Sequence, residues 1–167
     1  MIMARLKQET RVYHEQLEAN PYSRALMDGT LSRTDYRVML ERFYGFYLPL
    51  EMQLHSMVLP SLNLYERMKT PLLLRDLQAL GSEVERLTPC TDVPTIDTPQ
   101  RALGVLYVVE GATLGGQLIA RQLKRMGLDA ETGAAFFSSY GANVGEMWKA
   151  FFTTVNSYAA MYGGEDS

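Results

Sequence analysis

The stretch YVVEGATLGGQLIARQLKRMG, residues 107–127, decides the fold. Its apolar side chains recur at helical spacing, yet Gly111, Gly115 and Gly116 interrupt them. A glycine inside a helix costs roughly 0.5–1 kcal/mol relative to alanine, so three of them require a compensating role. Two roles fit the pattern: close approach of the backbone to a flat or bulky ligand, and close packing against another helix. A phosphate-binding loop is excluded, because no Gly-Lys-Ser/Thr ending and no preceding strand accompany these glycines.

The remainder of the chain is also helical in its periodicity, and no alternating strand pattern persists. Thr98 and Pro99 form a cap and first-turn pair that opens the central helix, expected over residues 99–126. The other expected helices cover residues 2–19, 22–28, 33–58, 62–69, 72–80, 130–137 and 140–162. The sequence therefore predicts one all-α domain over residues 1–162, followed by a flexible tail over residues 163–167.

Composition places the chain among ordinary globular proteins and excludes several classes of function. It has 167 residues, 47% hydrophobic and 21% charged, with a net charge of -3 that gives no basis for binding nucleic acid. The lone Cys90 excludes an internal disulfide framework and a multi-cysteine zinc site. Apolar runs shorter than a membrane span and the lack of a signal peptide predict a cytoplasmic protein without a membrane partner.

A second informative stretch is ARLKQETRVYHEQLEANPY, residues 4–22. At about 100° per residue, four of its polar side chains share one narrow side of a helix: Lys7, Arg11, His14 and Glu18. A neutral imidazole is a good iron ligand, and a carboxylate four residues on is placed to accept its other ring N–H. The two cations are placed to neutralise carboxylates of a ligand. The alternative is a solvated polar face with weak ion pairs worth about 0.2–0.5 kcal/mol.

Together, these stretches resemble the haem oxygenase family. The resemblance is carried by LKQETRVYHEQLE (6–18), GTLSRTDYRVMLERFYGFYLPLE (29–51), EGATLGGQL (110–118) and FFSSYGANVGEMWKAFFTTVNSY (136–158). It implies a single-domain multi-helical bundle in which haem b lies between a proximal first helix and a glycine-kinked distal helix. The distal segment is most similar to bacterial members associated with bacteriophytochromes, which need biliverdin as chromophore.

On the proximal side, the resemblance implies that His14 is the axial ligand of the haem iron and that Glu18 is its hydrogen-bond partner. It places Lys7 and Arg11 near the haem propionates. Lys149 lies close to a propionate-binding position, although a shift of one residue would put Trp148 there instead. Tyr140 is a further candidate for the same rim.

On the distal side, the resemblance implies that Gly115 and Gly116 let the helix lie over the haem and leave room for O2. Gly111 is assigned to the same haem-contacting surface, and Tyr47 matches a pocket tyrosine. Ala112 stands where animal members carry an aspartate that organises the water network for proton delivery.

The implied activity is opening of the haem ring with O2 and external electrons, to give biliverdin, CO and ferrous iron. A ferredoxin- or flavin-type reductase would supply the electrons, and a bacteriophytochrome is a possible acceptor of biliverdin. A non-catalytic haem carrier or sensor on the same fold stays open as an alternative. Two rival classes fit less well: Cys90 is poorly placed as a thiaminase-like nucleophile, and Glu51 with His55 lacks the di-iron Glu-x-x-His spacing.

Overall fold

The computed structural model describes residues 2–59 and 61–162, and within them it contains helices and no strand. The helices are α1 (Ile2–Ala19), α2 (Pro21–Met27), α3 (Arg33–His55), α4 (Thr70–Ala79), α5 (Pro99–Arg125), α6 (Ala135–Ser138) and α7 (Val144–Tyr162). Three 3₁₀ turns accompany them: η1 (Tyr65–Arg67), η2 (Val84–Arg86) and η3 (Gly141–Asn143). The predicted all-α class is confirmed, whereas the predicted tail over 163–167 lies outside the described residues.

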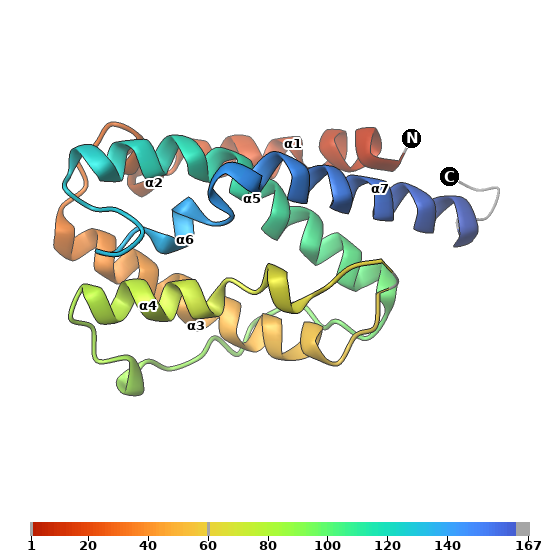
Figure 1. The fold of residues 1–167 in the computed structure, drawn as a ribbon, viewed down its shortest axis with the longest axis horizontal. Helices are drawn as coiled ribbons and strands as arrows, with labels where there is room; N and C mark the ends of the chain where they lie inside the picture. The colour runs from red at the N-terminus through yellow and green to blue at the C-terminus, as the bar shows by residue number, and fades with distance from the viewer. Residues whose placement is uncertain (1, 60, 163–167) are drawn as a thin grey trace.

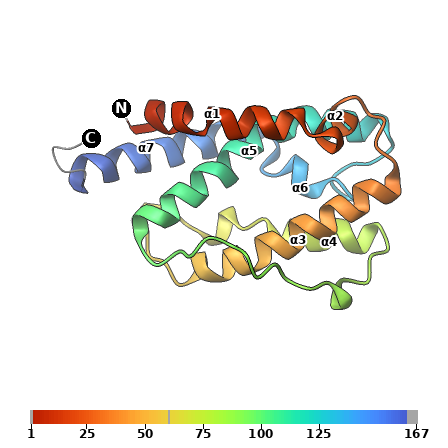
Figure 2. The same cartoon turned by 180° about the vertical axis from the view of Figure 1, so that it is seen from behind.

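Helix α5 connects two groups of helices (Figure 1). Helices α3 and α4 pack together along one edge of the molecule, and α1, α2 and α7 lie along the other. Between them, α5 runs diagonally and contacts α2, α6 and α7. Seen from behind, α1 lies in front, along the same edge as α7 and the second half of α5 (Figure 2). The orientation of α5 therefore decides which of its faces is buried and which stays open.

Side-chain caps fix the starts of α3 and α5, and the cap at Thr98 confirms the one that the sequence analysis names. Ser32 Oγ accepts the backbone N–H of Asp35 at 3.0 Å at the start of α3. Thr98 Oγ1 accepts the N–H of Arg101 at 3.3 Å at the start of α5. Each cap satisfies one of the backbone donors that a helix N-terminus leaves free.

Two predicted helices are shorter in the structure than in the sequence analysis. The segment 62–69 forms only η1, and the segment 130–137 forms only α6, which begins at Ala135. The Asp129 carboxylate explains the second difference, because Oδ1 accepts the N–H groups of Glu131 and Thr132 at 2.9 and 3.1 Å. These local bonds favour a turn over helix, as aspartate often does.

A buried carboxylate also holds the start of the short helix α6. Asp76, on α4, accepts the N–H groups of Ala135 and Phe136 at 2.7 and 2.8 Å, so it anchors α6 against α4. Burial raises the pKa of Asp76 to about 6, although the two backbone hydrogen bonds act in the opposite direction. A four-residue helix has little stability of its own, so this anchor determines where α6 lies.

Tyr36 links α3 to the loop before α6 and offers a test of this arrangement. Its side chain is fully buried, and its hydroxyl donates a hydrogen bond to the Gly133 carbonyl at 2.8 Å. Tyr36→Phe keeps the ring but leaves a buried carbonyl unsatisfied, so we expect a loss of about 1–3 kcal/mol in unfolding free energy. Urea unfolding followed by circular dichroism measures this. Tyr22→Phe, at an exposed tyrosine of α2, is the matched control and should change stability by less than about 0.5 kcal/mol; equal stability of the two variants would contradict the prediction.

Candidate functional site

The polar side of α1 is open to solvent. Every residue from 11 to 20 is exposed, and the His14 side chain retains 73% of its accessible surface. His14 Nδ1 lies 3.3 Å from Glu18 Oε1, which is the contact that their spacing predicts. Arg11 pairs with Glu15 at 3.6 Å on the same exposed surface. With Nδ1 engaged by Glu18, Nε2 is the ring nitrogen of His14 that is left to bind a ligand.

An apolar seam runs along α1 beside His14, and only half of it is covered. Met3, Leu6, Thr10, Tyr13 and Leu17 follow one another at intervals of three and four residues, so they share one side of the helix. Met3 is buried and Leu6 half-buried in the core that α1 shares with α7. Tyr13 and Leu17 continue the seam but are 68% and 64% exposed. His14 therefore borders an apolar surface that no other helix among residues 2–59 and 61–162 covers.

A second open apolar surface lies on α5. Five exposed residues at helical spacing form it, and we call them the apolar stripe: Gly104, Val108, Ala112, Gly115 and Leu118. None is charged, and Val108 and Leu118 are 59% and 51% exposed. By length and composition alone, α5 is apolar enough to cross a membrane, the single helix of the described residues with this property. In the fold its other face packs into the core, so the stripe is what remains uncovered, and uncovered apolar patches of this kind mark binding surfaces.

The three glycines between residues 111 and 116 of α5 face different surroundings. A Cβ on Gly116 would lie 3.0 Å from the Phe137 carbonyl oxygen, so this glycine permits close packing of α5 on α6. A Cβ on Gly111 would contact the Trp148 ring at 3.8 Å. A Cβ on Gly115 would meet nothing within 4 Å. The two roles that the sequence left open are thus divided: Gly116 serves helix packing, and Gly115 lies bare in the apolar stripe.

The predicted site residues fall into two groups. Those on open surfaces of α1, α5 and α7 are Lys7, Arg11, His14, Glu18, Gly115 and Lys149. Those that face the interior are Tyr47, Gly111, Gly116 and Tyr140, as described here and below. Lys149 is exposed on α7 while Trp148 packs against the core, so the lysine of this pair is the one available to an anionic ligand.

Tyr47 and Tyr140 are both half-buried, and neighbouring side chains hold each of them in place. Tyr47 packs between the rings of Phe43 and Phe136, where burial and the nearby Glu51 and Glu110 carboxylates raise its pKa far above the usual range. The Tyr140 hydroxyl donates to Glu110 Oε1 at 2.6 Å. A buried carboxylate thus holds the hydroxyl of the half-buried Tyr140, and its role at the propionate rim stays a prediction.

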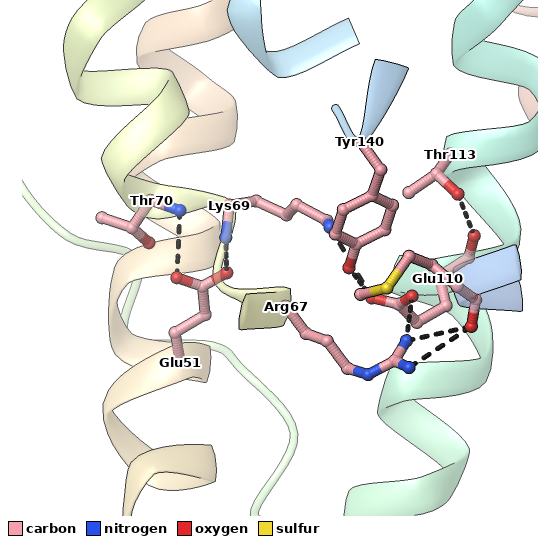
Figure 3. Close-up of polar contacts among 8 residues, drawn as sticks. Glu51, Arg67, Lys69, Thr70, Glu110, Thr113 and Tyr140 are labelled. Carbon is pink, nitrogen blue, oxygen red and sulfur yellow. Dashed lines mark hydrogen bonds and ion pairs between the residues drawn. The ribbon is translucent and has the colours of Figure 1, made fainter. Parts of the chain in front are cut away.

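Behind α5 lies a charged cluster that sequence reasoning missed (Figure 3). It consists of Glu51, Arg67, Lys69, Glu110 and Tyr140. The Glu110 side chain has no exposed surface, and its Oε2 lies 2.5 Å from Arg67 Nη1. Lys69 Nζ lies 3.6 Å from Glu110 Oε1 and 3.7 Å from the centre of the Tyr140 ring. A single signal existed in the sequence: Glu110 is a carboxylate inside the apolar run VVEGA.

The charged cluster is balanced in formal charge, and its four ionic side chains are buried. Glu51 completes it by accepting the backbone N–H groups of Lys69 and Thr70 at 2.5 and 3.0 Å, at the start of α4. Arg67 also donates to the Met147 carbonyl at 3.3 Å. Burial lowers the pKa of Lys69 to about 8, although Glu110 and Glu51 favour its charged form. Two carboxylates therefore face two cations in an interior where electrostatic interactions are weakly screened.

A surface hollow of about 460 Å³ lies against the first half of α5 and is lined by Pro94, Thr95, Arg101, Gly104, Val105 and Val108. Two of these residues belong to the apolar stripe, so the stripe opens into this hollow. Within the described residues, no three His, Cys, Asp or Glu side chains come together to hold a metal ion directly. The di-iron alternative therefore finds no support in these residues.

The buried ammonium of Lys69 predicts a specific pH dependence of stability. Because its folded pKa is about 8 and its ordinary value is 10.5, the folded state releases this proton first. The unfolded state then binds more protons between these values, so unfolding free energy should rise from about pH 8 to about pH 9.5, below the range where tyrosines titrate. Lys69→Met should remove this rise in urea unfolding at graded pH. The exposed Lys124→Met is the control and should retain it; a rise that persists in Lys69→Met would contradict the assignment.

Comparison with known proteins agrees with the resemblance. The model of a family described as Heme oxygenase matches residues 1–161. A heme oxygenase from Xanthomonas campestris pv. campestris (strain 8004) is 32% identical over 103 residues. That match covers 60% of this chain and 60% of the relative, so it spans less than two thirds of the length of that protein. Since the family model spans almost the whole chain, the protein belongs to the haem oxygenase family.

Proposed function

We propose that the protein binds haem between α1 and α5 and opens its ring, as a haem oxygenase. The observation that carries this proposal is the position of His14. Its Nδ1 is engaged by Glu18, and it borders the open half of the apolar seam on α1. The second half of α5, which carries the bare Gly115 of the apolar stripe, lies along the same edge of the molecule as α1 (Figures 1 and 2). A flat apolar ligand that carries a metal and carboxylates fits this combination.

On the proximal side, Nε2 of His14 would hold the iron. Glu18 at 3.3 Å fixes the tautomer and orientation of the ring and raises the basicity of the ligand nitrogen. Tyr13 and Leu17 would contact the porphyrin, because they are the exposed apolar residues next to His14. Covering them with a ligand would remove apolar area from water at about 25 cal/mol per Å².

Three exposed cations are available for the propionates. Lys7 and Arg11 lie within about 60° of His14 around α1, one or two turns towards its N-terminus. Lys149 is exposed on α7, the helix that packs against the first half of α1. A guanidinium and two ammonium groups near two carboxylates would fix the orientation of the haem in its plane.

On the distal side, α5 would supply shape rather than acid or base. Gly115 lets the backbone approach the ligand, and Ala112, Leu118 and Val108 offer no ionisable group. Bound haem supplies the iron that activates O2 and is itself the ring that is cut to biliverdin, CO and ferrous iron. Electrons would come from a ferredoxin- or flavin-type reductase. Protons would arrive through water held by backbone carbonyls, since the stripe has no acid.

The setting proposed for this reaction is the cytoplasm, with a bacteriophytochrome as the acceptor of biliverdin. The similarity of the distal segment EGATLGGQL to bacterial members associated with bacteriophytochromes supports that acceptor. A haem carrier or sensor is the second candidate function. The observation that favours it is Ala112, because the apolar stripe then lacks any side chain that organises proton delivery.

Haemin titration tests the iron ligand. Added to the purified protein, haemin should give a Soret band of a histidine-ligated complex, and His14→Ala should abolish or strongly shift this band. The matched control is His55→Ala, which removes the other histidine, an exposed residue whose Nε2 contacts the Tyr65 hydroxyl at 3.1 Å. His55→Ala should bind haemin like the unaltered protein. An unchanged Soret band in His14→Ala would refute the assignment.

The haemin complex also distinguishes a haem oxygenase from a non-catalytic haem carrier. With ascorbate or a reductase in air, an oxygenase should lose its Soret band and form a biliverdin-like absorber. A carrier would keep the ring intact under the same conditions. Pigment analysis of the extracted product decides between them.

Gly115→Leu tests the distal surface. The new side chain meets no protein atom near its Cβ and replaces a poor helix former, so unfolding free energy without haem should stay equal or rise by up to about 1 kcal/mol. It would occupy the proposed haem surface, so we expect the haemin Kd to rise by about tenfold or more, roughly 1.4 kcal/mol. Isothermal or fluorescence-quenching titration measures the Kd.

Gly104→Leu is the control for this experiment. Gly104 has equally open surroundings on α5 but lies about 16 Å from Gly115 along the helix axis. Its substitution should leave the haemin Kd within about twofold. Equal losses of affinity at both positions would contradict the placement of haem at the second half of α5.

A further inference from the structure

The glycine segment of α5, residues 111–116, packs against the core on its inner side and is exposed on its outer side. On its inner side, Gly116 lies against the Phe137 carbonyl and Gly111 against Trp148. The Thr113 hydroxyl donates to the Glu110 carbonyl at 2.6 Å, a bond from a hydroxyl back to the preceding turn. On its outer side lie Ala112 and Gly115 of the apolar stripe. Within α5 itself, a charged side chain can therefore act on a ligand at the stripe only from the inner side of the helix.

Glu110 is the charged group placed to exert that influence. It is the only charged residue between Arg101 and Arg121, and it directly precedes the glycine segment. Its carboxylate binds Arg67 of η1 and accepts the Tyr140 hydroxyl, while Lys69 lies 3.6 Å away (Figure 3). Through these contacts, a single side chain connects α5 to three segments distant in sequence.

The geometry limits how far this charge lies from the stripe. Glu110 projects to the core side of α5, and the stripe lies on the opposite side of the same helix. A helix with its side chains is about 10 Å across, so the carboxylate lies roughly that far from a ligand on the stripe. The side chain is fully buried, and at this depth solvent and salt screen its charge weakly.

Resting on the proposed function, we propose that Glu110 is a positioning residue that fixes the glycine segment of α5 from behind and tunes the reduction potential of the iron bound beside it through its buried charge. Its negative charge favours the ferric state, which carries one more positive charge than the ferrous state. Lys69 and Arg67 oppose this influence. The charged cluster thus acts on the charge state of the iron from the inner side of α5, whereas Ala112 offers no charge on the outer side.

The ferric/ferrous midpoint potential of the haemin complex tests this, measured by redox titration in the visible range. Glu110→Gln keeps the shape and removes the negative charge, so the potential should shift upward. Lys69→Met removes a positive charge, so the potential should shift downward. The double variant should lie between them. The control is Glu41→Gln, a half-buried carboxylate on α3 that pairs with Arg37 and Ser82, and it should leave the potential unchanged.

If Glu110→Gln fails to fold, Tyr140→Phe provides a second variant for the measurement of the midpoint potential. It preserves every formal charge but removes the hydrogen bond to Glu110 Oε1, which leaves more negative charge on the carboxylate, so the potential should shift downward. Shifts of opposite sign for Glu110→Gln and Lys69→Met support the inference, because a general loosening of the core would move both in one direction. Shifts of the same sign, or none in Lys69→Met and Tyr140→Phe, would overturn it. Failure of the unaltered protein to form a His14-dependent haemin complex would instead overturn the proposed function.

Discussion

The burial of Glu110 is the constraint on which the rest of the arrangement depends. A lone carboxylate without exposed surface would be strongly destabilising, so the fold must bring partners to it. Arg67, Lys69 and Tyr140 meet this need, and they come from η1, the start of α4 and the segment before η3. With these contacts formed, the side of α5 that carries Glu110 is buried and the apolar stripe is left exposed.

A long helix can then serve packing and binding at once, because its two sides meet different surroundings. The inner side of α5 needs Gly116, since a Cβ would lie 3.0 Å from a backbone oxygen of α6. The position of α6 in turn depends on Asp76, whose carboxylate anchors its first N–H groups. The outer side gains from Gly115 only if something approaches the backbone there. The cost of the glycines between residues 111 and 116 therefore has a structural reason at Gly116, and the proposed haem binding would supply a reason at Gly115.

Local chemistry in the sequence was enough to predict most of the fold and half of the candidate site. Caps at Ser32 and Thr98 and the periodicity of α1, α3, α5 and α7 act over a few residues, so they are visible in the sequence. The His14–Glu18 contact follows from helical spacing in the same way. The charged cluster could not be predicted, because Arg67 and Glu110 are 43 residues apart and only the tertiary fold brings them together. For the same reason, the interior position of Tyr140 was not visible, since its partner is 30 residues away.

The separation of charge from the open surface bears on how this family member would handle protons. Ring opening consumes protons at the stripe, yet Ala112, Gly115 and Leu118 offer none. Glu110 is the nearest carboxylate on the helix, but it faces inward and already accepts from Arg67 and Tyr140. The electrostatic effect of its buried charge extends across the helix, whereas Glu110 cannot transfer a proton to a ligand on the opposite side. The proposed arrangement would therefore divide two tasks that a distal aspartate would combine: the charged cluster would act on the iron from behind α5, and water held by backbone carbonyls would deliver the protons.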